Sequence, residues 1–221
     1  MTSPALEQDI AAVAAELESA PAVDIVRWGV ERFGDGLVVL TSFQDAVLVD
    51  VAVQADPDVR IAFLDTQYHF PETWEYVDTV RERYPGLNLE VVTPEVEPDE
   101  RWRTDIDGCC HVRKVEPLER VLADRSAWVT GVRRVDSPLR ATTPVVTVDR
   151  RGKVKLNPLA TWTDEQLAAY VAERDLPVHP LQPLGFLSIG CWPCTRAVRP
   201  GEDPRAGRWS GTGKSECGLH L

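Results

Sequence analysis

The sequence lacks a long hydrophobic run: nowhere in its 221 residues do about 18 apolar residues follow one another. A helix that spans a bilayer needs about 20 of them, so we expect no membrane-spanning segment and no membrane partner. Residues 1–22 carry acidic residues and no basic segment before an apolar one, which is unlike a secretory signal. The sequence therefore predicts a cytoplasmic protein, in a compartment where thiols stay reduced.

Positive charge is also scarce. The chain has 24 Lys and Arg against 35 Asp and Glu, a formal net charge of −11. Proteins that bind nucleic acid through nonspecific attraction present a basic surface. This acidic excess predicts no nucleic-acid partner, although a local group of cations can still bind a small anion.

Cysteine is sparse, and its five occurrences fall in three short motifs. Cys109 and Cys110 are adjacent, Cys191 and Cys194 form a Cys-Trp-Pro-Cys sequence, and Cys217 lies near the end of the chain. An odd number of cysteines in a reducing compartment favours metal or catalytic roles over disulfides. Four thiolates are the usual ligands of zinc or of a four-iron cluster.

Several interpretations of these cysteines stay open. Neighbouring side chains point in different directions, which makes Cys109 and Cys110 awkward ligands for one tetrahedral zinc and easier ligands for a wider iron–sulfur cube. The same pair is also compatible with two buried thiols. Cys191 and Cys194 alone are compatible with a redox pair. We favour a metal site because no cysteine lies outside the three motifs.

Short apolar runs alternate with helical patterns, which is typical of an α/β fold with a mainly parallel sheet flanked by helices. We predict strands at 37–40, 60–64, 87–92 and 127–130, helices within 6–33 (broken at Pro21) and at 46–55, 71–84, 113–123 and 164–173, and a hairpin over 145–155. One α/β domain spans residues 1–198. Residues 199–221, rich in Gly, Pro, Arg and Ser, are predicted to form a flexible, mobile C-terminal tail.

Polar residues follow the predicted parallel strands, whose carboxyl ends meet at one edge of the sheet and bind ligands there. These residues are Ser42, Phe43, Gln44 and Asp45 after the first strand, Asp65 and Thr66 after the second, and Arg133 and Arg134 after the fourth, with Arg140 close behind. A helix amino end holds phosphate and arginine forks to phosphate or sulfate oxygens, so we expect an anion site here.

A second group of candidates surrounds Cys217, which is poorly placed for packing in a polar stretch. Cations that suit closure over an anion lie near it or near the cysteine pair: Lys114, Arg205, Arg208, Lys214 and His220. Cys217 is a candidate nucleophile. Taken alone, Cys217 fits an incidental terminal cysteine better than a nucleophile, and Lys114 is also compatible with a solvated lysine.

The sequence from about residue 37 onward resembles the sulfonucleotide reductase family, and within it the assimilatory adenylyl-sulfate reductases. The residues that carry the resemblance are Leu64-Asp65-Thr66, Cys109-Cys110-His111-Val112-Arg113-Lys114 with Pro117-Leu118, Trp128-Val129-Thr130-Gly131-Val132-Arg133-Arg134, Gly190-Cys191-Trp192-Pro193-Cys194-Thr195, Gly207-Arg208-Trp209 and Glu216-Cys217-Gly218-Leu219-His220.

This resemblance implies an adenine nucleotide alpha hydrolase-like fold and reduction of adenosine 5'-phosphosulfate (APS) to sulfite and AMP. It implies one 4Fe-4S cluster per chain on Cys109, Cys110, Cys191 and Cys194, with Cys217 as the nucleophile. It implies substrate contacts from Leu64, Asp65, Thr66, Lys114, Arg133, Arg134, Arg208 and the 42–45 loop, with Arg140, Arg205 and His220 in support. Two departures stand out: the 42–45 loop lacks the glycines of ATP-cleaving relatives, and Gln67 replaces an expected glycine.

In the mechanism that we expect, Cys217 attacks the sulfate sulfur and forms S-sulfocysteine, and thioredoxin releases sulfite because no resolving cysteine remains. Family members that have the four cluster cysteines use APS, and a reductase of the 3'-phosphorylated nucleotide (PAPS) is the nearest alternative. More distant alternatives are a zinc-containing adenylyltransferase and an iron–sulfur redox sensor, which the missing loop glycines and the net charge oppose, respectively. The sequence leaves a homo-oligomer open.

Overall fold

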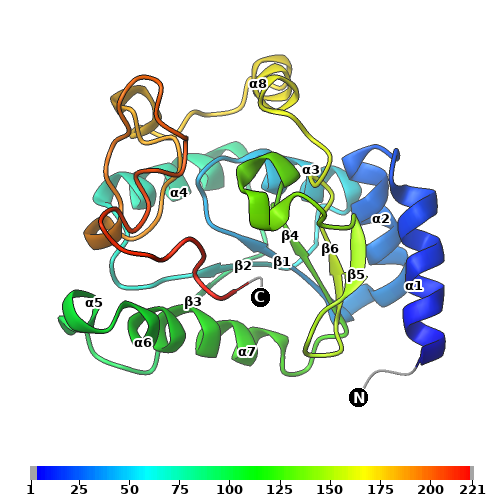
Figure 1. The fold of residues 1–221 in the computed structure, drawn as a ribbon. Coiled ribbons are helices and arrows are strands. Elements are labelled where there is room, and N and C mark those ends of the chain that lie inside the picture. Colours follow the sequence, from blue (N-terminus) through cyan, green and yellow to red (C-terminus); the bar gives the residue numbers. More distant parts are fainter. Residues whose placement is uncertain (1–3, 220–221) are drawn as a thin grey trace.

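The protein was analysed as a computed structural model, which describes residues 4–219. Its centre is a sheet of strands in the order β3-β2-β1-β4-β6-β5 (Figure 1). Neighbouring strands are parallel, except that β5 pairs antiparallel with β6. The strands are β1 (Leu37–Thr41), β2 (Ile61–Leu64), β3 (Leu89–Val92), β4 (Ala127–Thr130), β5 (Val146–Val148) and β6 (Val154–Leu156). The predicted parallel sheet and hairpin are confirmed.

Helices cover both faces of the sheet. Those on or near it are α1 (Pro4–Leu17), α2 (Ala22–Phe33), α3 (Val47–Ala55), α4 (Pro71–Arg83), α5 (Arg101–Thr104), α6 (Ile106–Cys110), α7 (Glu116–Leu122) and α8 (Asp164–Glu173). Helices α1 to α4 pack on one face, whereas α7 packs on the other (Figure 1). No helix of the described residues is long and apolar enough to cross a membrane.

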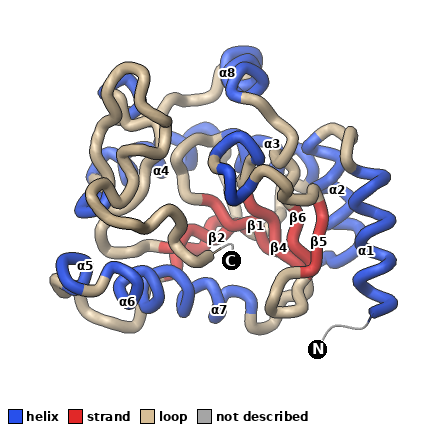
Figure 2. The backbone as a smooth tube through the Cα atoms, viewed as in Figure 1, coloured by secondary structure: helices blue, strands red, loops and turns tan. Residues whose placement is uncertain are grey.

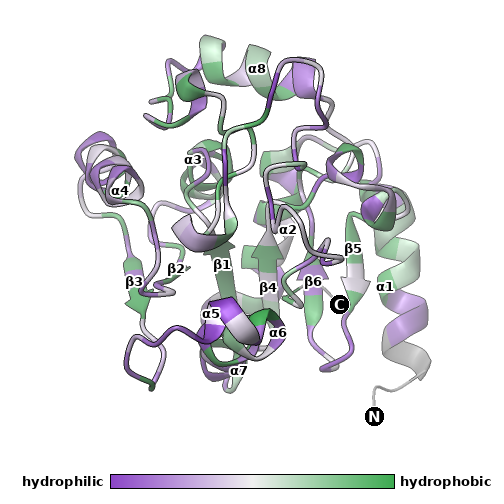
Figure 3. Ribbon diagram, turned by 60° about the vertical axis from the view of Figure 1, so that its left-hand side comes forward, coloured by the Kyte–Doolittle hydropathy of each residue, from purple (hydrophilic) through white to green (hydrophobic). Residues whose placement is uncertain are grey.

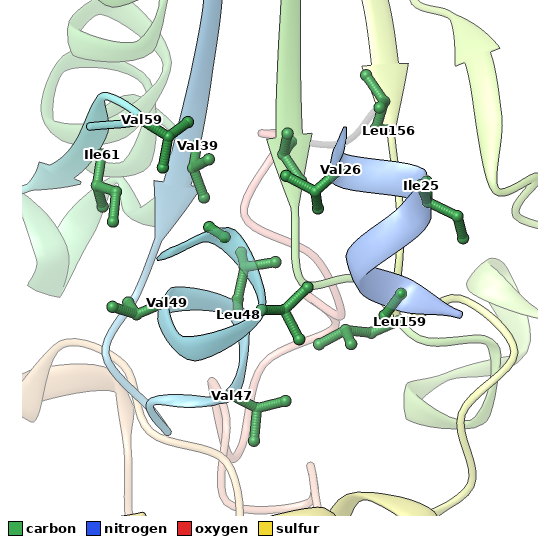
Figure 4. Close-up of a cluster of buried hydrophobic side chains, with 14 of the residues drawn as sticks. Ile25, Val26, Val39, Val47, Leu48, Val49, Val59, Ile61, Leu156 and Leu159 are labelled. Atoms are coloured by element: carbon green, nitrogen blue, oxygen red, sulfur yellow. The ribbon is translucent and has the colours of Figure 1, made fainter. Parts of the chain in front are cut away.

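Strand β1 shows why these residues form a central strand. All five of its side chains are buried, and successive ones point to opposite faces. Leu37 and Val39 join the larger core against α1 to α4, whereas Val38 and Leu40 join the smaller core against α7. Figure 4 shows part of the larger core, in which Val39 and Leu156 of the sheet face Val26 and Leu48 of the helices. Apolar residues accordingly dominate the central strands (Figure 3).

The predicted helix at 113–123 is the main difference in secondary structure. A helix already begins at Ile106, because the Asp105 side chain caps it by accepting a hydrogen bond from the Gly108 nitrogen at 2.8 Å. A π-helical turn over His111–Val115 joins α6 to α7. Asp105 was the signal that sequence reasoning missed, and the cysteine pair lies at the end of α6, before the predicted helix start at 113.

Residues 199–219 contain no helix or regular strand and fold back beside the body of the protein (Figure 2). Arg208 forms an isolated bridge with Thr195, and the Trp209 nitrogen donates to the Cys194 carbonyl at 2.8 Å. Leu219 packs against the smaller core beside α7. This segment therefore lies docked, and its predicted mobility stays a prediction.

Candidate active site

The loops after β1 and β4 line a cavity. These two strands are neighbours, and the chain leaves them toward opposite halves of the sheet, which is where open α/β sheets bind ligands. The cavity has a volume of about 440 Å³. Ser42 and Gly131 follow the two strands directly and both line it.

Most of the site residues predicted from sequence line this cavity. They are Ser42, Gln44, Asp45, Leu64, Thr66, Lys114, Arg133, Arg140, Arg205, Arg208 and Cys217. They come from six separate stretches of sequence, so the fold brings together the strand ends, the cysteine-pair helix and the C-terminal segment.

Four residues predicted around the anion site and Cys217 do not line the cavity. One of them, Lys214, pairs with Asp107 instead. The Phe43 side chain is buried and packs edge-on against Phe63, with ring centres 5.1 Å apart. The Asp65 carboxylate instead accepts from the Gln67 nitrogen at 2.7 Å. Arg134 points away and donates to Glu18, the residue after α1, at 2.6 and 3.0 Å. His220 lies outside the described residues.

The loop after β1 is shaped by its own polar groups. Phe43 adopts φ = 52°, a conformation that is strained for a side chain of its size, and its nitrogen donates to Thr41 Oγ1 at 3.2 Å. Asp45 accepts from the Val47 nitrogen at 3.0 Å at the start of α3. Burial raises the pKa of the Asp45 carboxyl and outweighs the lowering effects of that hydrogen bond and of Arg133. Gln44 Oε1 accepts a hydrogen bond from the Ile189 nitrogen, which links this loop to the segment around Ile189.

The backbone of the turn after β2 shows why a glycine was expected at position 67. Gln67 adopts φ = 66°, the left-handed region that favours glycine. Its side chain is held by two partners: the amide nitrogen donates to the Val96 carbonyl at 3.0 Å, and the amide oxygen accepts from Arg113. Arg113 is itself almost fully buried and stacks over Tyr68. These contacts hold Gln67 in its strained conformation.

The remaining four cysteines lie together beside the active-site cavity. Cys109, Cys110, Cys191 and Cys194 all line a second, much smaller cavity. Burial raises the pKa of Cys109 and Cys110, and burial together with the other thiols raises that of Cys194 to about 11. Thr66 Oγ1 lies 3.2 Å from Cys191 Sγ, so the strand-end site and the cysteine site share a wall.

The adjacent cysteines lie at the end of α6, directly before the π turn. Both Cys109 and Cys110 are buried and both line the small cavity, although neighbouring helical side chains diverge. The turn begins at the next residue, and π turns are frequent at functional sites. Within residues 4–219, no three His, Cys, Asp or Glu side chains lie close enough to hold one metal ion. The four thiols thus surround a cavity without converging on a single point.

Lys114 lies between the two cavities and lines both. Its side chain is buried and has no ion-pair partner among the described residues. Burial lowers its pKa, but the sulfurs of Cys191, Cys217 and Cys110 outweigh this effect and the net pKa is raised. Lys114 is therefore a charged ammonium next to both the cysteine group and Cys217.

Arg208, like Lys114, lines the active-site cavity and has no carboxylate partner among the described residues. Its guanidinium stacks over Trp209 at 4.6 Å and donates to Ser188 Oγ at 3.3 Å. Its Nε is buried and unpartnered within the described chain. Gly190 permits this placement, since a Cβ there would lie 2.4 Å from Arg208 Nη2. Arg208 thus keeps donor capacity for an anion in the cavity.

Arg133 and Arg140 belong to a network of ion pairs along one wall. Arg133 donates to Asp136 at 2.9 Å and pairs with Asp164 of α8, also at 2.9 Å. Arg140 pairs with Asp136 at 3.2 Å and with Glu216 at 2.7 Å. These arginines are already neutralised by carboxylates, unlike Lys114.

Sequence reasoning missed several residues that line the cavity: His69, Asp136, Asp164, Gln182, Ser188, Trp209 and Glu216. His69 Nε2 donates to the Leu64 carbonyl at 3.0 Å, and burial lowers the pKa of the imidazole. Glu216 and Trp209 were visible as parts of the motifs Glu-Cys-Gly-Leu-His and Gly-Arg-Trp. The others carry no local signal, because only the tertiary fold brings them to the cavity.

Fold and site together define an adenine nucleotide alpha hydrolase-like protein with a cysteine-lined cavity. A yeast FAD synthetase in complex with FAD superposes with a TM-score of 0.57 at 15% identity, over 89% of this chain and 70% of that one. A phosphoadenylyl-sulfate (PAPS) reductase from Candida auris, in a phosphate complex, gives a TM-score of 0.75 at 30% identity, over 87% of this chain and 97% of that one. The first likeness shows the fold alone.

Sequence comparison then gives the family. Residues 36–197 match the phosphoadenosine phosphosulfate reductase domain, so the chain belongs to that family, the sulfonucleotide reductases. The adenosine 5'-phosphosulfate reductase of Streptomyces coelicolor is 48% identical over 93% of this chain and 90% of its own length. That of Halalkalibacterium halodurans is 44% identical over 92% and 93%, respectively.

Proposed function

We propose that this chain reduces APS to sulfite and AMP in assimilatory sulfate reduction, with Cys217 as the nucleophile. One observation carries the proposal: Cys217 lines the same cavity as the strand-end loops and the cations Lys114, Arg133 and Arg208. A thiol held among cations in a nucleotide-type cavity suits attack on an anionic, activated sulfate.

The choice of APS over PAPS follows the relatives. Those 44–48% identical over most of their length are named adenosine 5'-phosphosulfate reductases, whereas the PAPS reductase from Candida auris is 30% identical. Reduction of PAPS is therefore the alternative, and a comparison of kcat/KM for the two nucleotides separates them.

In the first step the Cys217 thiolate forms a bond to the sulfate sulfur. The bond from that sulfur to the bridging phosphate oxygen breaks, its electron pair stays on the oxygen, and AMP leaves. The product on the enzyme is S-sulfocysteine. Negative charge grows on the bridging oxygen, and the ammonium of Lys114 and the guanidinium of Arg208 are the cations that face it without a carboxylate partner.

In the second step an external thiol attacks Cys217 Sγ and displaces sulfite. A second thiol of the same donor then closes a disulfide and frees Cys217, so two thiols are oxidised and the sulfate sulfur is reduced by two electrons. The other four cysteines line the neighbouring cavity, so a dithiol protein such as thioredoxin supplies both thiols. The tail must expose Cys217 for this exchange, which needs the mobility predicted for residues 199–221.

We also propose one 4Fe-4S cluster per chain, held by Cys109, Cys110, Cys191 and Cys194. Four thiols that surround a cavity without converging on one point fit a cube, which takes one ligand at each iron, better than they fit a single zinc ion. When bound, the cluster supplies a fixed negative charge beside Lys114. The positive charges of Lys114 and the buried Arg113 balance that charge.

The decisive experiment uses APS labelled with ³⁵S. The wild type, incubated without a thiol donor, should become labelled on the peptide that contains Cys217. The Cys217→Ser variant should bind AMP with the affinity of the wild type and remain unlabelled. Labelling of that variant would show that another residue is the nucleophile.

A further inference from the structure

The carboxylate that precedes Cys217 is buried and held by arginine at two points. Glu216 is 7% exposed at its side chain. Arg140 Nε donates to Glu216 Oε1 at 2.8 Å and Arg140 Nη2 donates to Oε2 at 2.7 Å. Ser137 Oγ adds a third donor at 3.3 Å. A two-point pair of this kind fixes both position and orientation.

Arg205 reinforces the same contact from within the C-terminal segment. Its Nη2 lies 3.5 Å from Glu216 Oε2 and donates to the Ser215 carbonyl at 3.1 Å. The two residues before Cys217 are thus both held, Ser215 at its carbonyl oxygen and Glu216 at its carboxylate. Burial raises the pKa of Glu216, but the arginines outweigh this and lower it, so the carboxylate is charged.

The cations around the cavity consequently fall into two groups. Arg140 and Arg205 are both engaged by the Glu216 carboxylate, and Arg140 also by Asp136. Arg133 belongs with them, because Asp136 and Asp164 pair with it. Lys114 and Arg208 have no carboxylate partner among the described residues. Only the second group is free to neutralise a bound anion.

We infer that Glu216 is a positioning residue for Cys217, and that Arg140 serves this carboxylate rather than the nucleotide. The inference deepens the function proposed above, because it takes Cys217 as the nucleophile. Docking of Glu216 on Arg140 places the neighbouring thiol over the cavity. Release of this contact, rather than a change in the nucleotide site, frees the tail for the external thiol.

The test compares Glu216→Gln, Arg140→Gln and the double variant in the cluster-loaded protein. Each single variant should lower kcat at least about tenfold with little change in KM for APS, since misplacement of a reacting group by about 1 Å can cost about 100-fold. The double variant should be no worse than either single one, because both residues act through one contact. Glu216→Asp, which keeps the charge, should recover part of kcat.

Two further measurements separate positioning from substrate binding. Alkylation of Cys217 by iodoacetamide, followed on its peptide by mass spectrometry, should be several-fold faster in Glu216→Gln and Arg140→Gln than in the wild type. Affinity for AMP should be unchanged in both variants. A matched control is Glu202→Gln, which removes another ion-paired carboxylate of the same segment, the partner of Arg196 at 2.9 Å, and should change neither quantity.

Weaker AMP binding in Arg140→Gln with no effect of Glu216→Gln would overturn the inference and make Arg140 a substrate ligand. Unchanged alkylation and kcat in Glu216→Gln would overturn it as well. Failure of the proposed function is distinguishable, since it would appear as an unlabelled wild-type Cys217, whereas alkylation and AMP binding do not depend on APS chemistry.

Discussion

Asp50 of α3 should contribute strongly to stability although it lies outside the active site. Its carboxylate is 2% exposed and accepts from Tyr170 at 2.6 Å, Tyr84 at 2.7 Å and Arg174 at 3.1 and 3.3 Å. Gln54 donates to it as well, at 2.7 Å. These donors come from α3 itself, from the residue after α4 and from α8 and its end, so one carboxylate joins three helices.

The change Asp50→Asn keeps the shape of the side chain but replaces one acceptor oxygen with a donor. At least two donors then lose their acceptor in a buried place, at about 1–1.5 kcal/mol each, and the hydrogen bonds to charge are weakened further. We expect a loss of about 3 kcal/mol in the free energy of unfolding. For a chain of this size that corresponds to a fall in Tm of about 6–12 °C.

The assay is thermal unfolding at pH 7 with Asp24→Asn as the control. Asp24 also pairs with an arginine, Arg27, but both side chains are about half exposed, and such pairs contribute about 0–1 kcal/mol. Burial raises the pKa of Asp50, yet its hydrogen bonds outweigh this and lower it. Its contribution is therefore complete above the ordinary pKa of 3.8 and is lost as the pH falls through the lower folded value. A Tm for Asp50→Asn equal to that of the control would refute this reasoning.

Two other predictions concern a buried histidine and the cysteine cavity. His179 is fully buried, Nδ1 accepts from the Leu181 nitrogen, and burial lowers its pKa to about 4 from 6.5. The His179 imidazole therefore stays neutral in the folded protein but binds a proton in the unfolded protein, so the free energy of unfolding should fall by about 3 kcal/mol from pH 6.5 to pH 4. The Tm of His179→Asn should fall less steeply over this pH range than that of the wild type. Equal slopes would contradict the assignment. Cys194→Ser should lose iron, acid-labile sulfide and visible absorption yet keep AMP affinity, because Cys194 lines only the smaller cavity; unchanged iron content would remove Cys194 from the ligand set.

The sequence determined the class of fold, and it predicted the roles proposed for the five cysteines. Strands buried on both faces read as continuous apolar runs, and β1 and β4 were predicted to within one residue for this reason. Residues placed directly at strand ends, such as Ser42 and Arg133, were predicted to share a site because parallel strands end at one edge. Local patterns were sufficient wherever a residue's position follows from its own strand or helix.

Only the tertiary structure decided which charges are available to a ligand. Arg134 and Arg133 are neighbours in sequence, yet Arg134 pairs with Glu18 just after α1 and Arg133 lines the cavity. Arg140 and Arg205 are held by Glu216, whereas Lys114 is left without a carboxylate partner among residues 4–219. The physical reason is that ion pairs such as Arg134–Glu18 and Arg140–Glu216 join side chains from distant segments, and spacing along the chain does not encode these partners.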